Sequence, residues 1–278
     1  SSDLDILIGF EIVNNIHDEN YPKLASKDIY GNSYFDIPRP LNKQFWMNEF
    51  QIPLQRLLQD WKNPKVSNGT KITGIVLDLE MYGRKTTSEF LPTMGFDQPT
   101  AISTDIVPKV YTQSPNQLAS YLSAHKKTKR YFLTLERKAA ELGQELKDFV
   151  QKEIPNGMVC CYAPNISTDW FYKGLYKGIS SPENPLLLFT FNAEFYIHKD
   201  WLLFNKIQAK HASVLMLSKL EKPGDFKWVD YVLQRHDGIW LNRFSRMAEP
   251  HKKDWAALER TPLPTEERYK FAKYVGAR

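Results

Sequence analysis

An apolar run that ends in two carboxylates constrains the fold of this chain more than any other stretch. Residues 72–77 are rich in aliphatic and β-branched side chains, which is typical of a strand buried on both faces of a parallel sheet. Asp78 and Glu80 follow at the end of this run. Because side chains alternate along a strand, the two carboxylates point the same way, with Cβ atoms roughly 6.5–7 Å apart.

Burying two like charges side by side is costly, so stability alone does not account for Asp78 and Glu80. In α/β barrels, side chains at the carboxyl ends of the strands build the active site. The alternative is that each carboxylate caps a loop or pairs with a nearby cation, for which Arg84 and Lys85 are available. We favour the catalytic interpretation, because both acids stand at the strand end where the chemistry would take place.

Five further apolar runs predict strands, and the amphipathic segments between them predict helices. We expect strands at 4–13, 72–77, 158–163, 186–191, 212–217 and 238–242. We expect helices at 42–62 with a kink at Pro53, at 115–125, at 131–153 and at 265–277. Strands that alternate with helices indicate a parallel sheet, and 278 residues suit one barrel. We therefore predict an α/β fold, a (β/α)8 TIM-type barrel that forms a single domain over 1–278.

Six predicted strands fall short of the eight that a complete barrel needs. Either two strands lie in the irregular stretches, or the chain begins inside the barrel and lacks its first βα units. A doubly wound open sheet is the alternative architecture. The sequence contains no Gly-x-Gly-x-x-Gly or Walker loop, which removes the commonest nucleotide-binding version of that fold. We expect no cofactor.

The charge and cysteine content of the chain indicate which kinds of partner and site to exclude. Its net charge of +5 comes from 37 basic and 32 acidic residues, and we expect no nucleic-acid binding. The densest basic cluster, 126–130, is interpreted as a solvated helix end. Cys160 and Cys161 are adjacent, so they point to opposite faces of a strand and are expected to be buried core residues without a disulfide. No Cys/His spacing typical of zinc is present.

No apolar stretch approaches the length of a membrane helix, and no signal peptide is recognised. If the Ser1-Ser2 start is a processed end, we expect a secreted or periplasmic protein. Aromatic residues make up 13% of the chain, which suits the stacking of flat apolar faces such as sugar rings. Large cores use aromatic residues too, so a carbohydrate partner and aromatic core packing are both open on this observation.

Several polar and aromatic residues beyond the two acids follow predicted strands and are candidate substrate-binding groups. Long loops that leave strand ends are frequently functional. Trp170 has two interpretations of nearly equal weight, because it either lines a sugar subsite or begins a helix that packs on the sheet. The candidates are Glu11, Tyr82, Asn165, Trp170, Asn192, Glu194 and Trp240.

With these residues in view, the chain resembles TIM-barrel glycoside hydrolases of the chitinase-like family 18, or a related family. Asp78-Leu79-Glu80 at a strand end resembles the terminal Asp-x-Glu of that family. Trp240 in the last strand resembles the Trp on which the family stacks its sugar. The sequence departs from the family at Gly74 and Ile75, which take the places of its upstream aspartates. For the family's active-site Tyr the candidates are Tyr82, Tyr162 and Tyr196.

The resemblance implies that Glu80 is the general acid/base that protonates the leaving glycosidic oxygen. Asp78 would then assist by orienting a 2-acetamido group of the substrate, which acts as the nucleophile. In an ordinary retaining glycosidase the nucleophile is instead a second carboxylate about 5–5.5 Å away, for which Glu194 is the candidate and Asp78 the fallback. Asn165 and Asn192 would hydrogen-bond sugar hydroxyls.

Two other functions use the same residues. The first is a barrel that binds a glycan through Trp240, Trp170 and Tyr82 without cleaving it, which the absence of the upstream acids favours. The second is a metal-dependent hydrolase. Its ligands would be Asp78, Glu80, His17 and His236. We rank it third, because isolated histidines more often serve as core or surface residues than as ligands.

Overall fold

The computed structural model of this chain describes residues 5–11, 25–67, 69–79, 93–162, 170–190, 195–216 and 226–242. The chain divides into two compact units, Ser1–Leu187 with Asp200–Ala209, and Leu188–Lys199 with Lys210–Arg278. The prediction of a single domain over 1–278 stays a prediction. No helix in the described ranges combines the length and apolar character that crossing a membrane requires.

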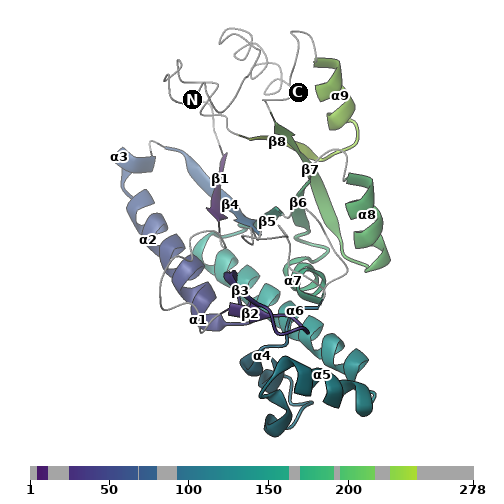
Figure 1. Cartoon of the computed structure of the whole chain (residues 1–278). Helices are drawn as coiled ribbons and strands as arrows, with labels where there is room; N and C mark the ends of the chain where they lie inside the picture. Colours follow the sequence, from purple (N-terminus) through teal and green to yellow (C-terminus); the bar gives the residue numbers. More distant parts are fainter. Residues whose placement is uncertain are drawn as a thin grey trace, which may run out of the picture. The chain divides into compact units, whose positions relative to one another are not determined.

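The fold is α/β, with a curled parallel sheet of six strands in the order β1-β4-β5-β6-β7-β8 (Figure 1). All six strands fall where the apolar runs predict them, so the predicted parallel sheet is confirmed. Six strands are compatible with part of a barrel, and the described residues do not make the complete eight-stranded barrel. The strand bounds are β1 Asp5–Glu11, β4 Lys71–Asp78, β5 Met158–Tyr162, β6 Leu186–Thr190, β7 Ala209–Met216 and β8 Gly238–Asn242.

A short antiparallel hairpin stands apart from this sheet. β2 (Ala25–Lys27) pairs with β3 (Ser33–Pro38), and Gly31 in the turn has a φ of 89°, a conformation that favours glycine. Asp28 holds the turn together, because its carboxylate accepts the backbone N–H groups of Tyr30 and Asn32, each at 2.9 Å. Neither strand of this hairpin is among the six predicted strands, because so short an alternation does not stand out in the sequence.

The helical segment after the hairpin is irregular at its centre. α1 (Lys43–Trp46) is capped by Asn42, continues as the π-helical turn η2 (Met47–Gln51), and then becomes α2 (Ile52–Trp61). Pro53 sits in the first turn of α2, where a missing N–H costs least. The predicted kink at Pro53 is therefore accommodated as a π-turn just before it. α1, η2 and α2 lie along the last three turns of the longest helix, through the pairs Lys43–Glu145, Phe50–Phe149 and Gln55–Glu153.

The longest helix, α6 (Thr128–Glu153), packs closely against α7 (Trp170–Ile179), and Figure 1 shows the two side by side. Glycines allow this approach. A Cβ at Gly174 would collide with the backbone of Glu136, one at Gly178 with that of Ala140, and one at Gly143 with that of Leu175. The backbones of the two helices are thus in contact, which only glycine permits at these positions.

The remaining helices of the first unit are short. The predicted helix start at Ser114-Pro115 is confirmed, since the Ser114 side chain accepts the N–H of Gln117 at 3.3 Å. The predicted helix at 265–277 lies outside the described residues. The helix bounds not yet given are α3 Pro64–Ser67, α4 Gln98–Ser103, the 3₁₀-helix η3 Lys109–Thr112, α5 Pro115–Ala124, α8 Phe195–Phe204 and α9 Phe226–Leu233.

The core of the sheet contains both cysteines, as expected. Cys160 and Cys161 on β5 are free thiols with no exposed surface. Burial raises the pKa of the Cys160 thiol to about 12, because the protein interior disfavours the thiolate. These cysteines are small core residues, and nothing in their surroundings activates them.

Candidate functional site

The carboxyl ends of β1, β4 and β5 bring three polar residues to one level of the sheet. In the parallel register, Asp78 is the Cα partner of Glu11 on one side and of Tyr162 on the other. Neighbouring strands lie about 4.8 Å apart, so residues in register are direct neighbours. Asp78 is half-buried and Tyr162 is 5% exposed. The first predicted acid therefore stands in a row with a second predicted site residue and a tyrosine.

An irregularity near the start of β4 sets this register. Ile6 pairs with Ile72, but Leu7 pairs with Gly74, so Thr73 is an extra residue in β4. The Thr73 hydroxyl donates a hydrogen bond to the Ile6 carbonyl at 3.4 Å. Without this bulge, Glu11 would face Leu77 in place of Asp78, because a slip of one residue reverses the alternation.

Gly74, which departs from the family pattern, has a structural cause. A Cβ at this position would collide with the backbone oxygen of Met158 on β5 and approach its nitrogen to 2.9 Å. β5 lies so close to β4 here that an aspartate at position 74 would require the strands to separate. Ile75 is fully buried. These two positions serve the packing of β4 against its neighbours.

The segment immediately after Asp78 is held on both sides. The N–H of Leu79 donates to the Tyr162 carbonyl at 2.8 Å, and the Tyr172 hydroxyl of α7 donates to the Leu79 carbonyl at 3.0 Å. Leu79 is 1% exposed and Tyr172 is fully buried. The backbone that leads into Glu80 is therefore anchored to β5 and to α7.

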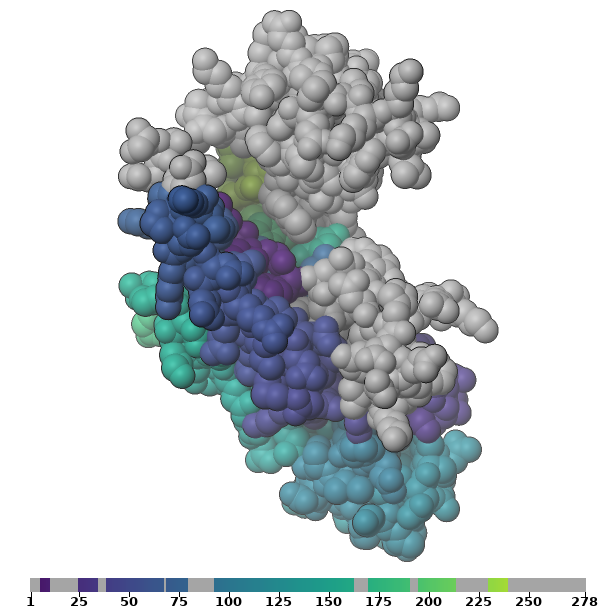
Figure 2. Space-filling view, turned by 90° about the vertical axis from the view of Figure 1, so that its left-hand side faces the viewer, coloured from purple at the N-terminus to yellow at the C-terminus, as the bar shows by residue number. Residues whose placement is uncertain are grey.

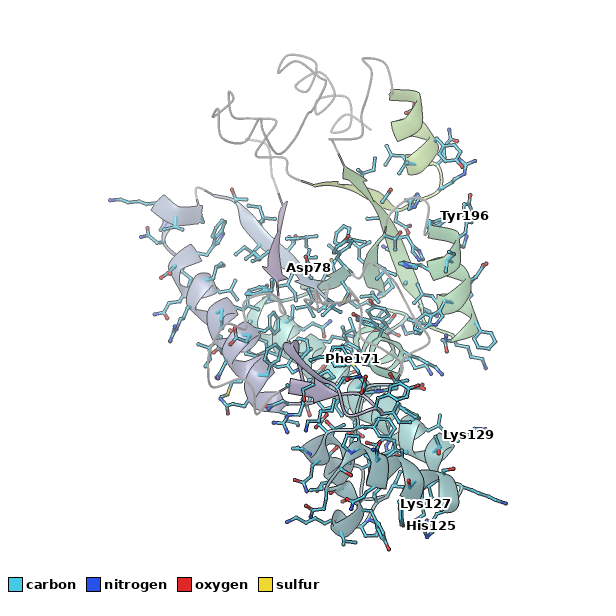
Figure 3. All side chains as sticks on the ribbon, in the orientation of Figure 1. Asp78, His125, Lys127, Lys129, Phe171 and Tyr196 are labelled. Atoms are coloured by element: carbon cyan, nitrogen blue, oxygen red, sulfur yellow. The ribbon has the colours of Figure 1, made fainter. Side chains whose placement is uncertain are left out.

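The alternation of β4 separates its two faces. Ile75, Leu77 and Leu79 on one face are at most 1% exposed and belong to the core. Val76 on the other face is 9% exposed, and Asp78 next to it is half-buried. The carboxylate thus lies on the more open face of the strand, as Figure 3 shows by its label at the end of β4.

Most of the other predicted site residues lie outside the described residues. These are Glu80, Tyr82, Asn165, Asn192 and Glu194. Glu11 and Trp240 are placed by their backbone alone, Glu11 at the end of β1 and Trp240 in the middle of β8, where it is the register partner of Val214. The site roles assigned to these residues stay predictions.

Trp170 occupies a packed position. It begins α7, is 4% exposed, and donates its indole N–H to the Met94 carbonyl at 3.0 Å. Its ring also lies over Gly95, where a Cβ would come within 3.2 Å of it. This position agrees with the interpretation of Trp170 as the packing start of a helix. The described surroundings of Trp170 give a sugar ring no exposed face on which to stack.

In the second unit, two buried histidines lie against one phenylalanine ring, and a third histidine is buried on the same helix as that ring. The centroid of Phe195 on α8 lies 5.1 Å from that of His211 on β7 and 4.1 Å from that of His236, which follows α9. His198, one turn along α8, is fully buried. Desolvation lowers the pKa of His198 and of His211 to about 4, although Asp237 opposes the change at His211.

These histidines bear on the metal-dependent alternative. The His236 Nδ1 contacts the Val232 carbonyl at 3.0 Å, a local bond within the α9 end, and burial lowers its pKa. Within the described ranges, no group of three or more His, Cys, Asp or Glu side chains is arranged to hold a metal ion. Two of the proposed ligands, His17 and Glu80, lie outside those ranges.

Sequence reasoning missed the residues that support the acidic end. The resemblance offers Tyr162 only as a candidate for the family's tyrosine, and Tyr172 is not among the candidate residues. The signal for Tyr162 is its place at the end of an apolar strand that neighbours β4 in the sheet. No sequence signal marks Tyr172, because its bond to Leu79 crosses 93 residues of chain.

Comparison with known proteins gives a distant likeness. No protein-family model matches the chain, that of the chitinase-like family 18 included. No curated protein sequence matches it either. The chain is similar to a solved structure, the crystal structure of an agarase, AgWH50C, with 12% sequence identity and a TM-score of 0.47. The match covers 85% of this chain and 38% of the agarase, so the chain spans well under half the length of that protein.

Proposed function

We propose that this chain is a glycoside hydrolase that cleaves a polysaccharide or another glycan, with Glu80 as general acid/base and Asp78 as the assisting carboxylate. The observation that carries the proposal is the register of Asp78 with Glu11 and Tyr162 at the carboxyl ends of three parallel strands. In parallel α/β sheets this edge is where catalytic residues are placed.

The anchoring of Leu79 supports the role of its neighbours. A general acid must be held within hydrogen-bond reach of the oxygen that it protonates. Two hydrogen bonds hold the backbone of Leu79, between Asp78 and Glu80. The Leu79 N–H donates to the Tyr162 carbonyl, and the Tyr172 hydroxyl donates to the Leu79 carbonyl. Fixed backbone at a strand end provides the positional precision that such a carboxylate requires.

Two routes of glycoside cleavage are compatible with this arrangement. In the substrate-assisted route, Asp78 orients a 2-acetamido group of the substrate, as the resemblance to family 18 implies. In the ordinary retaining route, a second carboxylate attacks the sugar from about 5–5.5 Å away. Glu194 is the candidate nucleophile and Asp78 the fallback. Glu11, the register partner of Asp78, would add a carboxylate, and Trp240 would supply the apolar face on which the sugar stacks.

The test is the release of reducing ends from a panel of β-linked glycans that includes polymers of N-acetylglucosamine. The wild type is compared with Glu80→Gln, which keeps the shape of the side chain and removes the proton donor. Glu183→Gln is the matched control, because Glu183 is exposed in the turn before β6. A loss of about 10³-fold in Glu80→Gln with full activity in the control supports the proposal.

The competing function is a barrel that binds glycans without cleaving them. It predicts no release of reducing ends by any of the three proteins and equal binding of one glycan by all of them. That pattern would replace the hydrolase with a binding protein. Activity that is lost on chelation and restored by a divalent cation would favour the metal-dependent hydrolase.

A further inference from the structure

The positive charge of this chain is concentrated in one stretch. Residues 106–135 contain five basic residues and not one Asp or Glu. Removing these five from the 37 basic residues of the chain leaves 32, which equals the number of its acidic residues. The whole excess charge of +5 therefore resides in 30 consecutive residues, and the rest of the chain is balanced.

The fold brings this stretch together at one end of the first unit. The ring of Tyr111 on η3 stacks on Tyr121 of α5 at 4.6 Å between centroids, and Tyr121 stacks on His125 at 4.2 Å. The Nζ of Lys127 donates to the Tyr121 hydroxyl at 2.7 Å and to the Ile106 carbonyl at 3.4 Å. η3, α5 and the start of α6 thus form one continuous surface.

The outer members of this surface are open to solvent. We call it the basic surface and define it as Lys109, Tyr111, His125, Lys126, Lys129 and Arg130, all of which are exposed. Figure 3 places His125 and Lys127 next to each other with Lys129 nearby, away from Asp78, and Figure 2 shows the blue-green segment of α4, η3 and α5 as open surface. Tyr111 presents 43% of its surface beyond the stack.

The cations of the basic surface are not neutralised by their neighbours. Among the described residues, no carboxylate forms an ion pair with any of the five basic residues of 106–135. The next acid along the chain, Glu136, is engaged by Lys173 and Lys177 of α7. Asp105, the residue just before the stretch, is exposed. Its single carboxylate could balance at most one of the five positive charges.

Stability of α6 does not account for this arrangement. The positive end of a helix dipole is at its N-terminus, where acidic side chains are favourable and basic ones unfavourable. α6 has no acid in its first turn, and Lys129 and Arg130 lie there instead. Lys126 has a positive φ of 55°, a conformation that is unfavourable for lysine. Two cations placed against the preference of the helix, and a third in an unfavourable backbone conformation, indicate a partner that is negatively charged.

We propose that the basic surface binds an anionic polysaccharide, a chain of sugars that carry sulfate or carboxylate groups. Charge complementarity supplies the attraction, since the four cations of the basic surface, which pair with no carboxylate among the described residues, face a regularly charged polymer. The Tyr111 ring, backed by Tyr121 and His125, provides a flat apolar face for a sugar ring between the charges.

The composition of the basic surface favours a polysaccharide over a nucleic acid. Three of its four cations are lysines and one is arginine. Arginine is the residue that recognises phosphates and bases by paired hydrogen bonds, whereas lysine acts as a point charge. Tyr111 is the exposed tyrosine of the basic surface and offers a single platform, whereas single-stranded nucleic acids are bound on several successive aromatic rings. The polysaccharide binding is separate from cleavage at Glu80, so it is tested independently of the proposed hydrolase.

The test compares dextran sulfate with uncharged dextran as probes, by calorimetry at low salt. The full chain is expected to bind dextran sulfate and not dextran, with an affinity that falls as salt rises. The double substitution K129E/R130E is expected to weaken binding at least tenfold and to reduce the salt dependence. Tyr111→Ala is expected to weaken binding severalfold, and Tyr111→Phe to retain it.

K62E/K65E is the matched control. It makes the same change in net charge at two exposed lysines elsewhere in the first unit. Its affinity should stay within about twofold of the wild type. K129E/R130E places acids in the first turn of α6, so its melting temperature should rise while its binding falls. Glu80→Gln should bind dextran sulfate like the wild type, whether or not it retains hydrolysis.

Three results would overturn the proposal. The first is the absence of binding to dextran sulfate by the wild type. The second is an equal loss in K129E/R130E and in K62E/K65E, which would mean that only net charge matters. The third is tighter binding of a 20-nucleotide oligo-dT than of dextran sulfate, which would make the partner a nucleic acid.

Discussion

Glu11 and Asp78 are register partners across β1 and β4, because Thr73 inserts one extra residue into β4. Two carboxyl-bearing residues that are 67 positions apart in the chain therefore end neighbouring strands at the same level. The extra residue in β4 sets this register. It places Asp78 beside Glu11 and immediately before the anchored backbone that leads to Glu80.

Asp78→Asn is expected to lower kcat about 10²-fold with little change in the melting temperature. The amide keeps the shape of the side chain but cannot carry the negative charge that assists cleavage. Asp60→Asn on the exposed face of α2 is the matched control and should be silent. Steady-state kinetics on the substrate identified by the glycan panel make the measurement. An Asp78→Asn enzyme as active as the wild type would remove Asp78 from the mechanism.

Tyr172→Phe is expected to lower the free energy of unfolding by about 1–2 kcal/mol, because it deletes a buried hydrogen bond to the Leu79 carbonyl. It should also lower kcat more than it changes KM, since the freed backbone leads directly into Glu80. Tyr231→Phe on α9 is the control, because Tyr231 is 42% exposed. Urea unfolding and steady-state kinetics give the two readouts. Unchanged kcat in a destabilised Tyr172→Phe would limit the tyrosine to a role in packing.

Gly178→Ala is expected to destabilise the protein by about 2–3 kcal/mol, although alanine is the better helix former by about 1 kcal/mol. The new Cβ would collide with the Ala140 carbonyl of α6 and force the two helices apart. Gly9→Ala on β1 is the control, since a Cβ there has no atom within 4 Å. Thermal unfolding of both variants measures the change in stability. A Gly178→Ala protein of higher stability would contradict the backbone contact between α6 and α7.

Stability is expected to fall as the pH drops from about 6.5 to about 4. The pKa of His198 is lowered from 6.5 to about 4 by burial, so in this range the unfolded chain binds a proton that the folded chain does not. The free energy of unfolding therefore decreases by about 1.4 kcal/mol per pH unit for this histidine. His211 and His236 contribute in the same direction, with Asp237 opposing and Lys199 and Arg235 reinforcing.

His198→Leu separates this contribution from general acid sensitivity. Among the described residues, neither ring nitrogen of His198 has a hydrogen-bond partner, so an apolar side chain of similar size should fit without loss of stability at pH 7.5. The difference between urea midpoints at pH 7.5 and pH 5 should shrink relative to wild type. His125→Leu on the surface should leave it unchanged. If the difference between the two urea midpoints were as large in His198→Leu as in the wild type, other groups would be responsible for the pH dependence of stability.

The strands of the sheet are predictable from the sequence because each is a compact apolar run, and Asp78 and Glu80 are conspicuous because they stand at the end of one of these runs. The residues that neighbour Asp78 in the sheet are not predictable from the sequence. The bulge at Thr73 decides that Glu11 faces Asp78, and one extra residue in a strand has no signature in a hydrophobic pattern. The hairpin around Gly31 was missed for a related reason, since three residues of β2 are too few to show alternation.

Long-range contacts explain the other differences between prediction and structure. Trp170 could be a sugar platform or a packing residue on sequence grounds, and its bond to Met94 favours packing. The glycines at 174 and 178 look like helix-weakening residues until α6 is seen against them. Phe195, His211 and His236 lie on α8, on β7 and after α9, and only the fold brings their rings together.

The most direct test of the central claim is the rate at which Glu80→Gln releases reducing ends from the best glycan substrate, relative to wild type and Glu183→Gln. Without a proton donor, an unactivated glycosidic oxygen leaves poorly, so the rate should fall about 10³-fold. An activated aryl glycoside of the same sugar, whose leaving group needs no proton, should be cleaved by Glu80→Gln with a much smaller loss. Equal rates for Glu80→Gln and wild type on the unactivated glycan would contradict the assignment of the acidic end of β4 as a glycosidase site.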